Sequence, residues 1–336
     1  MDIKSTLKSL ADAAGTGSVR DAAHIAESEL SKYAKVTRTN GLGMIGEIKG
    51  KSDYTLMIEA HIDEIGFIVT DIDKNGFLTV SDCGGFDLRA LPSRQVDIHG
   101  KEKVRGVFCA TPPHLSEKDT VFEKISDMKI DTCLGKGASE LISVGDYVTF
   151  CTKSQDLSGD RMCGKSFDDR AGVCVALELA SRFKDGTAPV NLVFCLSDME
   201  ELDLRGAKTS AYRVFPNEAI AIDISFADGP DISKNDCGIL GRGAMIGVSP
   251  VIDRAVSDKL INLAKEKNIP YQTEVMGTST HTDADIISVT KSGVKTGLVS
   301  IPLRNMHTDS EIISLSDIKS VCDLLEAYIK GGGING

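Results

Sequence analysis

Three short, continuous apolar runs constrain the fold of this chain more than any other feature of its sequence. They span residues 190–196, 219–222 and 296–301, and polar or turn-forming residues bound each of them. Runs of this length without alternating polar positions are typical of strands buried on both faces, as in a parallel sheet. Because a helical pattern at residues 169–183 precedes the first run, we predict an α/β fold with a mixed, largely parallel sheet flanked by helices.

The pattern changes between about residues 70 and 160, where short strand-like segments alternate with turns. The strand-like segments span residues 95–98, 104–108 and 146–150. We therefore predict that residues 70–160 form an inserted, small β-rich domain. The remaining residues, 1–69 and 161–336, would then form one discontinuous α/β domain built from both ends of the chain.

The composition argues against several classes of partner. Lys and Arg number 38 against 49 Asp and Glu, and the formal net charge of −11 disfavours binding to nucleic acid or to anionic membranes. No run of 18 apolar residues and no signal-peptide pattern is evident in the sequence. Nine scattered cysteines without a CxxC pair indicate free thiols rather than a disulfide framework. We therefore expect a cytoplasmic protein.

Side chains that bind metals or transfer protons stand at the ends of the predicted strands. They are His61 and Asp63 after a strand at 54–58, Glu200 and Glu201 after the first apolar run, Asp223 after the second, and His307 after the third. Asp168 and Asp169 open the helical segment. In open parallel sheets the carboxyl ends of the strands lie along one edge, so these side chains can converge on one spot.

Taken singly, these residues have simpler explanations. A lone histidine such as His61 is more often a hydrogen-bonded residue than a ligand, and Asp169 fits the N-cap of a helix. Asp223 is harder to explain, because a carboxylate at the end of an apolar strand must be paired or bound to a cation. If the set converges, two imidazoles and three carboxylates suit two divalent ions, and a further carboxylate remains as a base. Such ligands accept zinc, cobalt and manganese alike.

Motifs of other hydrolases are missing, since the sequence contains neither HExxH nor GxSxG. Instead, a series of segments resembles, in the same order, the M42 family of dinuclear metal-dependent aminopeptidases, the relatives of glutamyl aminopeptidase and of the tetrahedral aminopeptidases. The segments are HIDEIGF at 61–67, TPPHL at 111–115, FDDRAG at 167–172, EE at 200–201 followed by LRGA at 204–207, AID at 221–223, TDA at 282–284, and IPLRNMH at 301–307. They cover nearly the whole chain.

The resemblance implies a zinc-peptidase-like fold and a role for each polar residue at the strand ends. The implied assignment is His61 and Asp223 on one metal ion, Glu201 and His307 on the other, and Asp168 as the bridge between them. Glu200 would be the general base that deprotonates the water between the two ions, and Asp63 would hold His61. The implied reaction is the removal of N-terminal residues from peptides.

The resemblance also implies an assembly. The β-rich domain at 70–160 would be a dimerisation domain, and dimers would assemble into large hollow particles, often of twelve subunits, that admit only peptides. The sequence departs from the family pattern at residues 197–203 and 305–309, and His281 stands where a glycine is typical. His281 is either an additional substrate contact or an exposed loop residue.

Two other functions remain as alternatives. Members of the family have been labelled cellulases, and adjacent Glu200 and Glu201 superficially resemble the acid and nucleophile of a glycoside hydrolase. However, adjacent side chains point in different directions, and the chain has no Trp to form a platform for a sugar ring. A non-catalytic metal-binding scaffold is disfavoured because every position of the implied metal site is intact.

Overall fold

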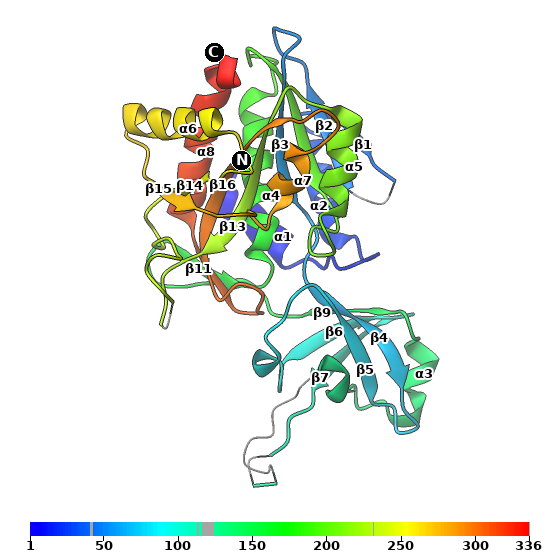
Figure 1. Ribbon diagram of the computed structural model, residues 1–336. Coiled ribbons are helices and arrows are strands. Elements are labelled where there is room, and N and C mark those ends of the chain that lie inside the picture. Colours follow the sequence, from blue (N-terminus) through cyan, green and yellow to red (C-terminus); the bar gives the residue numbers. More distant parts are fainter. Residues whose placement is uncertain (41–42, 113, 116–123, 231, 336) are drawn as a thin grey trace.

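The structure is a computed structural model that describes residues 1–40, 43–112, 114–115, 124–230 and 232–335. It contains a large mixed β-sheet flanked by helices and a small closed β-barrel, which projects from the larger unit in Figure 1. Pro113 of the TPPHL segment lies outside the described residues. Within the described part of the chain, no helix has both the length and the apolar character needed to span a bilayer.

The large sheet has the strand order β1-β2-β12-β3-β13-β16-β17-β11-β10, with β14 and β15 attached beside β16. Its strands are β1 (Lys35–Arg38), β2 (Gly43–Ile48), β3 (Thr55–His61), β10 (Gln155–Asp156), β11 (Arg161–Gly164), β12 (Asn191–Ser197), β13 (Glu218–Phe226), β14 (Ala244–Val248), β15 (Tyr271–Val275), β16 (Lys295–Arg304) and β17 (Glu311–Ser314). The central strands β12, β3, β13 and β16 run parallel, and antiparallel pairs lie on both sides of them. The predicted fold is confirmed, since the three apolar runs form β12, β13 and β16.

Helices cover both faces of this sheet. They are α1 (Ile3–Ala11), α2 (Asp21–Leu30), α4 (Phe167–Phe183), α5 (Arg205–Val214), α6 (Arg254–Lys267), α7 (Asp283–Ser288) and α8 (Leu315–Lys330). Alternate residues of a strand enter different cores: Ile58 belongs to the core with α1, α2, α4, α6 and α8, whereas Met57 belongs to the core with α5 and α7. This double burial is why the central strands are apolar at most positions.

The barrel is closed in the order β4-β5-β8-β7-β6-β9. Its strands are β4 (Gly66–Ile72), β5 (Leu78–Cys83), β6 (Gln95–His99), β7 (Lys103–Phe108), β8 (Ile130–Asp131) and β9 (Tyr147–Phe150), and α3 (Ala138–Leu141) precedes β9. Phe67 stands at the centre of its separate core. The Phe67 ring stacks on Phe86 with centroids 4.4 Å apart and meets Phe108 edge-on at 5.1 Å.

Truncation of Phe67 tests the packing of the barrel. Phe67 is fully buried, so Phe67→Ala would leave a cavity and lower the free energy of unfolding by about 3–5 kcal/mol. Val144→Ala is the matched control, because Val144 is 63% exposed and its truncation should change stability by less than about 0.5 kcal/mol. Urea unfolding followed by circular dichroism measures both. A loss below about 1 kcal/mol for Phe67→Ala would contradict the packing described here.

Candidate metal centre

The candidate site lies where parallel strands end on the face of the sheet that α5 and α7 cover. His61 is the last residue of β3, which ends three residues later than predicted, and Asp223 lies inside β13, which continues to Phe226. Because side chains alternate along a strand, Met57 and His61 point to the same face. Ala221 of β13 belongs to the core of that face, so Asp223 shares it.

Asp168 lies between the two histidines. Its Oδ1 is 3.2 Å from Nε2 of His61, and its Oδ2 is 3.3 Å from Nε2 of His307. The second histidine also lies 3.3 Å from Oε1 of Glu201. The Nε2 atom of His61 is 4.0 Å from a carboxylate oxygen of Glu200 and 4.0 Å from one of Asp223. The six side chains therefore meet in one cluster, with Asp168 at its centre.

Four further contacts orient the cluster. Both carboxylate oxygens of Asp63 accept hydrogen bonds, from the backbone N–H groups of Glu200 (3.1 Å) and Glu201 (3.3 Å). The same carboxylate lies 3.4 Å from Nδ1 of His61, which is longer than an ordinary hydrogen bond. Nδ1 of His307 lies 3.0 Å from the carbonyl oxygen of Gly85, which follows strand β5 of the barrel.

Burial and neighbouring charges shift the pKa values of the cluster. Burial acts to raise the pKa of Asp168, but hydrogen bonds with His307 and His61 outweigh it, so this pKa lies below its usual range. Burial raises the pKa of Asp223 well above its usual range. For His307, burial lowers the pKa, but the contacts with Asp168 and Glu201 dominate and raise it to about 11.

These donors fit divalent cations. Ligand atoms of Asp168, Glu201 and His307 lie within 4.8 Å of one another, and so do those of His61, Asp169 and Asp223. Two imidazoles face these four carboxyl groups and that of Glu200, so the cluster carries more acidic than basic groups in a buried place. In addition, Nδ1 of His61 and Oδ2 of Asp169 are buried without a hydrogen-bond partner among the described residues. Imidazole and carboxylate donors around a buried excess of negative charge are a ligand set for metal ions.

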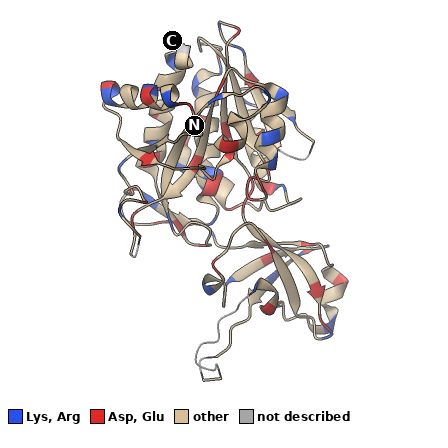
Figure 2. Cartoon of the chain, in the orientation of Figure 1, with Lys and Arg blue, Asp and Glu red and all other residues tan. Residues whose placement is uncertain are grey.

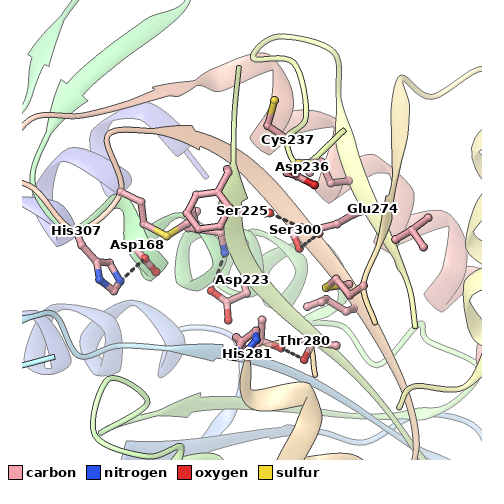
Figure 3. A pocket seen from close by; sticks show the side chains of 18 of the residues that line it. Asp168, Asp223, Ser225, Asp236, Cys237, Glu274, Thr280, His281, Ser300 and His307 are labelled. Carbon is pink, nitrogen blue, oxygen red and sulfur yellow. Dashed lines mark hydrogen bonds and ion pairs between the residues drawn. The ribbon is translucent and has the colours of Figure 1, made fainter. Parts of the chain in front are cut away.

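A cavity of about 550 Å³ opens from the cluster. Figure 3 shows Asp168 and His307 on one side of it, Asp223 near the middle, and Glu274, Ser225 and Ser300 farther along. His281 is exposed, in the left-handed backbone region with φ 57°, and it lines the cavity close to Thr280 in the same view. The role of His281 as a substrate contact stays a prediction.

Sequence reasoning missed two buried acids next to the cluster. Glu311 accepts backbone hydrogen bonds from Phe167 (2.6 Å) and His307 (3.2 Å), and so ties both proposed metal sites to β17. Glu59 shares the hydroxyl of Ser197 with Asp283 in a buried contact below the site. Glu59 lies two residues before His61 on the same strand, so both side chains point to the same face. This spacing could have indicated that Glu59 lies near the site.

Asp169 was explained as a helix N-cap, and the structure supports only part of that explanation. Its Oδ1 accepts a hydrogen bond from the backbone N–H of Gly172 at 2.9 Å, as a capping side chain does. However, Asp169 is fully buried rather than exposed in a first turn, and burial together with Asp223 raises its pKa well above the usual value. This residue therefore contributes to the acidic cluster.

Comparison with known proteins identifies similar sequences and structures. The model of the M42 glutamyl aminopeptidase family matches residues 43–324. A lysyl aminopeptidase of Pyrococcus furiosus is 29% identical over 309 residues, covering 90% of this chain and 88% of that protein. The family is named for glutamyl residues and this relative for lysyl residues at the N-terminus of the substrate.

Solved structures agree over the full length of the chain. The TET aminopeptidase of the marine sediment archaeon Thaumarchaeota archaeon SCGC AB-539-E09 superposes with a TM-score of 0.93 at 28% identity, covering 99% of this chain and 97% of that one. The TET1 peptidase of Pyrococcus horikoshii, which can assemble into a tetrahedron or a large octahedral shell, has a TM-score of 0.86 at 29% identity and covers 98% and 99%.

Cation binding should stabilise the folded chain. If zinc, cobalt or manganese binds the folded but not the unfolded state, each raises the unfolding temperature, by the equivalent of about 2.7 kcal/mol at 100 times its dissociation constant. Asp168→Asn should remove most of this effect, because Asp168 contacts both histidines. His24→Ala, a change of an exposed histidine on α2, is the control. Thermal unfolding of metal-stripped protein measures the shift, and an equal rise in Asp168→Asn would contradict the site.

Proposed function

The chain belongs to the M42 family of aminopeptidases, and from that premise we propose that it removes N-terminal residues from peptides at a centre of two divalent cations, with Glu200 as the general base. The single observation that carries the proposal is the position of Asp168 between His61 and His307. A carboxylate whose two oxygens face two different histidines has the geometry of a bridge between two ions. The cations would be zinc, cobalt or manganese.

The distances support the ligand sets that the family resemblance implies. His61 and Asp223 would hold one ion, Glu201 and His307 the other, and Asp168 both. When bound, two such ions lower the pKa of a water molecule and polarise a carbonyl group. Asp63 would act as a positioning residue, since it fixes the backbone of Glu200 and Glu201 and stands beside His61.

Glu200 would move the proton. Its carboxylate stands 4.0 Å from Nε2 of His61, at the edge of the cluster, and is not needed to complete either ligand set. Burial raises the pKa of Glu200 to about 10, with His61 opposing and Asp223 reinforcing the shift. Cations bound in the cluster would lower this pKa and keep Glu200 ionised, so that its carboxylate can accept a proton from water and return it to the leaving amine.

The acidic surroundings would also select the N-terminus of the substrate. A free α-amino group is positively charged below its pKa of about 8, and the cluster presents an excess of carboxylates to it. An internal peptide nitrogen has no charge to offer. Hydrolysis of one residue at a time from the N-terminus follows from this difference.

Glu200→Gln tests the general base. The variant should keep its metal ions, because the ligand atoms remain, and lose at least about 100-fold in kcat, as expected when a general base is removed. Asp203→Asn is the control, since Asp203 carries the same carboxylate three residues away with a side chain that is 91% exposed. Metal analysis and the hydrolysis of aminoacyl-anilides measure the two effects. Turnover within about 3-fold of the unmodified enzyme would refute the role of Glu200.

The same assay separates the enzyme classes. Purified protein incubated with zinc, cobalt or manganese should hold close to two ions per chain and hydrolyse aminoacyl-anilides and short peptides. Carboxymethyl-cellulose is the competing substrate, and activity on it alone would favour the glycoside hydrolase. A chain that binds metal and hydrolyses neither substrate would be the scaffold.

We also propose that residues 70–160, which contain most of the barrel, form the dimerisation domain and that dimers assemble into a dodecamer. Support comes from the TET1 peptidase, which is similar over nearly the whole chain and assembles into shells. The expected mass in analytical ultracentrifugation is twelve times 35.9 kDa. A monomer at micromolar concentration would contradict this assembly and leave the catalytic proposal intact.

The cytoplasm is the proposed compartment. All nine cysteines are free thiols, and Cys174, Cys195 and Cys322 are among the buried ones. Free thiols in this number are typical of a reducing compartment.

A further inference from the structure

The cavity beside the metal centre contains an acid that the proposed chemistry does not use. One end of the cavity is lined by the proposed ligands, and the other by residues of β13, β14, β15 and β16. At that other end lies Glu274 of β15, and exposed Asp236 stands nearby in Figure 3. Among the described residues that line the cavity, none is Lys or Arg. Figure 2 shows many of the Lys and Arg residues on the helices and loops of the chain.

Two serines hold the Glu274 carboxylate in place. Its Oε1 accepts a hydrogen bond from the hydroxyl of Ser225, and its Oε2 accepts one from Ser300 at 2.9 Å. Both oxygens act as acceptors, which is the arrangement of an ionised carboxylate. No Lys, Arg or His of the described chain forms an ion pair with Glu274. Burial raises the pKa of Glu274, and the two serine hydrogen bonds oppose the shift.

The two serines place this acid one side-chain length from the reaction centre. Ser225 follows Asp223 by two residues on β13, so the two side chains share a face with Cα atoms about 7 Å apart. Ser300 is the direct partner of Asp223 on the neighbouring strand β16. An extended lysine side chain spans roughly 6 Å from Cα to Nζ, as its bond lengths dictate. A substrate whose α-amino group is held at the cluster can therefore reach Glu274 with its side chain.

Apolar side chains line the same cavity as Glu274. Met245, Met276 and Leu298 line the same cavity, together with Phe226, whose side chain is exposed. The methylene groups of lysine and arginine pack on such walls, while the charged end needs an anionic partner. The cavity offers both apolar walls and an anionic partner.

We propose that this pocket selects peptides whose N-terminal residue is lysine or arginine, with Glu274 as the specificity-determining residue. The inference rests on the proposed aminopeptidase function and names its substrate class. An acidic N-terminal side chain would be repelled by Glu274. An aliphatic one would fill the apolar part and leave the Glu274 carboxylate desolvated without a cation, which is costly.

Lysine and norleucine form the matched substrate pair, because norleucine has the same stem without the ammonium group. The metal-loaded enzyme should hydrolyse lysyl-p-nitroanilide with a kcat/KM about 10- to 100-fold above that of the norleucyl substrate, and arginyl should resemble lysyl. Glutamyl-p-nitroanilide should be the poorest of the set. A norleucyl or glutamyl preference would overturn the proposal.

Glu274→Gln tests the residue itself. The glutamine keeps the shape and loses the charge, so the lysyl-to-norleucyl ratio of kcat/KM should fall at least about 10-fold, while the norleucyl value changes less than about 3-fold. Glu266→Gln makes the same change at an exposed acid of α6 and should leave the ratio unaltered. If Glu274→Gln fails to fold, Ser300→Ala, which removes one of the two hydrogen bonds, should lower the ratio by a smaller factor. An unchanged ratio in the folded variants would refute the assignment.

A binding measurement separates this inference from the proposed function. Calorimetry on the holoenzyme should give tighter binding of free L-lysine than of L-norleucine, and Glu274→Gln should abolish the difference. Equal binding of the two amino acids would contradict the pocket assignment, even if peptides are hydrolysed. A lysine preference in binding without hydrolysis of any anilide or peptide would contradict the proposed function alone.

Discussion

The burial of several carboxyl groups around two imidazoles is the constraint on which the rest of the structure depends. Like charges in a buried place repel each other, and the cost of desolvating them is recovered only through hydrogen bonds and opposite charges. Asp168 meets this requirement by facing His61 and His307, and the raised pKa of Asp223 marks a carboxyl group that lacks such compensation. The proposed divalent cations would supply the missing positive charge, so the stability of this edge of the sheet and its chemistry would have the same source.

Residues outside the cluster hold its geometry by contacting the backbone. Asp63 accepts hydrogen bonds from the peptide groups of Glu200 and Glu201. Glu311 accepts hydrogen bonds from the peptide groups of Phe167 and His307. The carbonyl of Gly85 orients the imidazole of His307 from a loop next to the barrel. This last contact connects the barrel to the candidate site. A displacement of the barrel would move a proposed metal ligand.

Much of this arrangement could be predicted from the sequence, because the strand-end rule and the order of the motifs both refer to local patterns. The runs that became β12, β13 and β16 are largely apolar and lack alternating polar positions, and that pattern alone indicates strands between two helical layers. The contact of Glu311 with Phe167 could not be predicted, since it joins residues 144 positions apart and no spacing rule connects them. Glu274 was missed for the same reason: it lies on an edge strand whose pairing with β14 is a tertiary feature.

The proposed metal ligands and the proposed specificity residue lie on different parts of the sheet. Asp223 and its partner Ser300 stand side by side on β13 and β16, strands fixed by the core, whereas Glu274 comes from β15, whose one partner among the described strands is β14. Substitutions on β15 can therefore change the charge of the pocket without moving a metal ligand. Such a division would allow similar chains to carry names as different as glutamyl and lysyl aminopeptidase. Under the proposed assignment, the metal ligands determine the reaction, and the charge at position 274 determines the substrate.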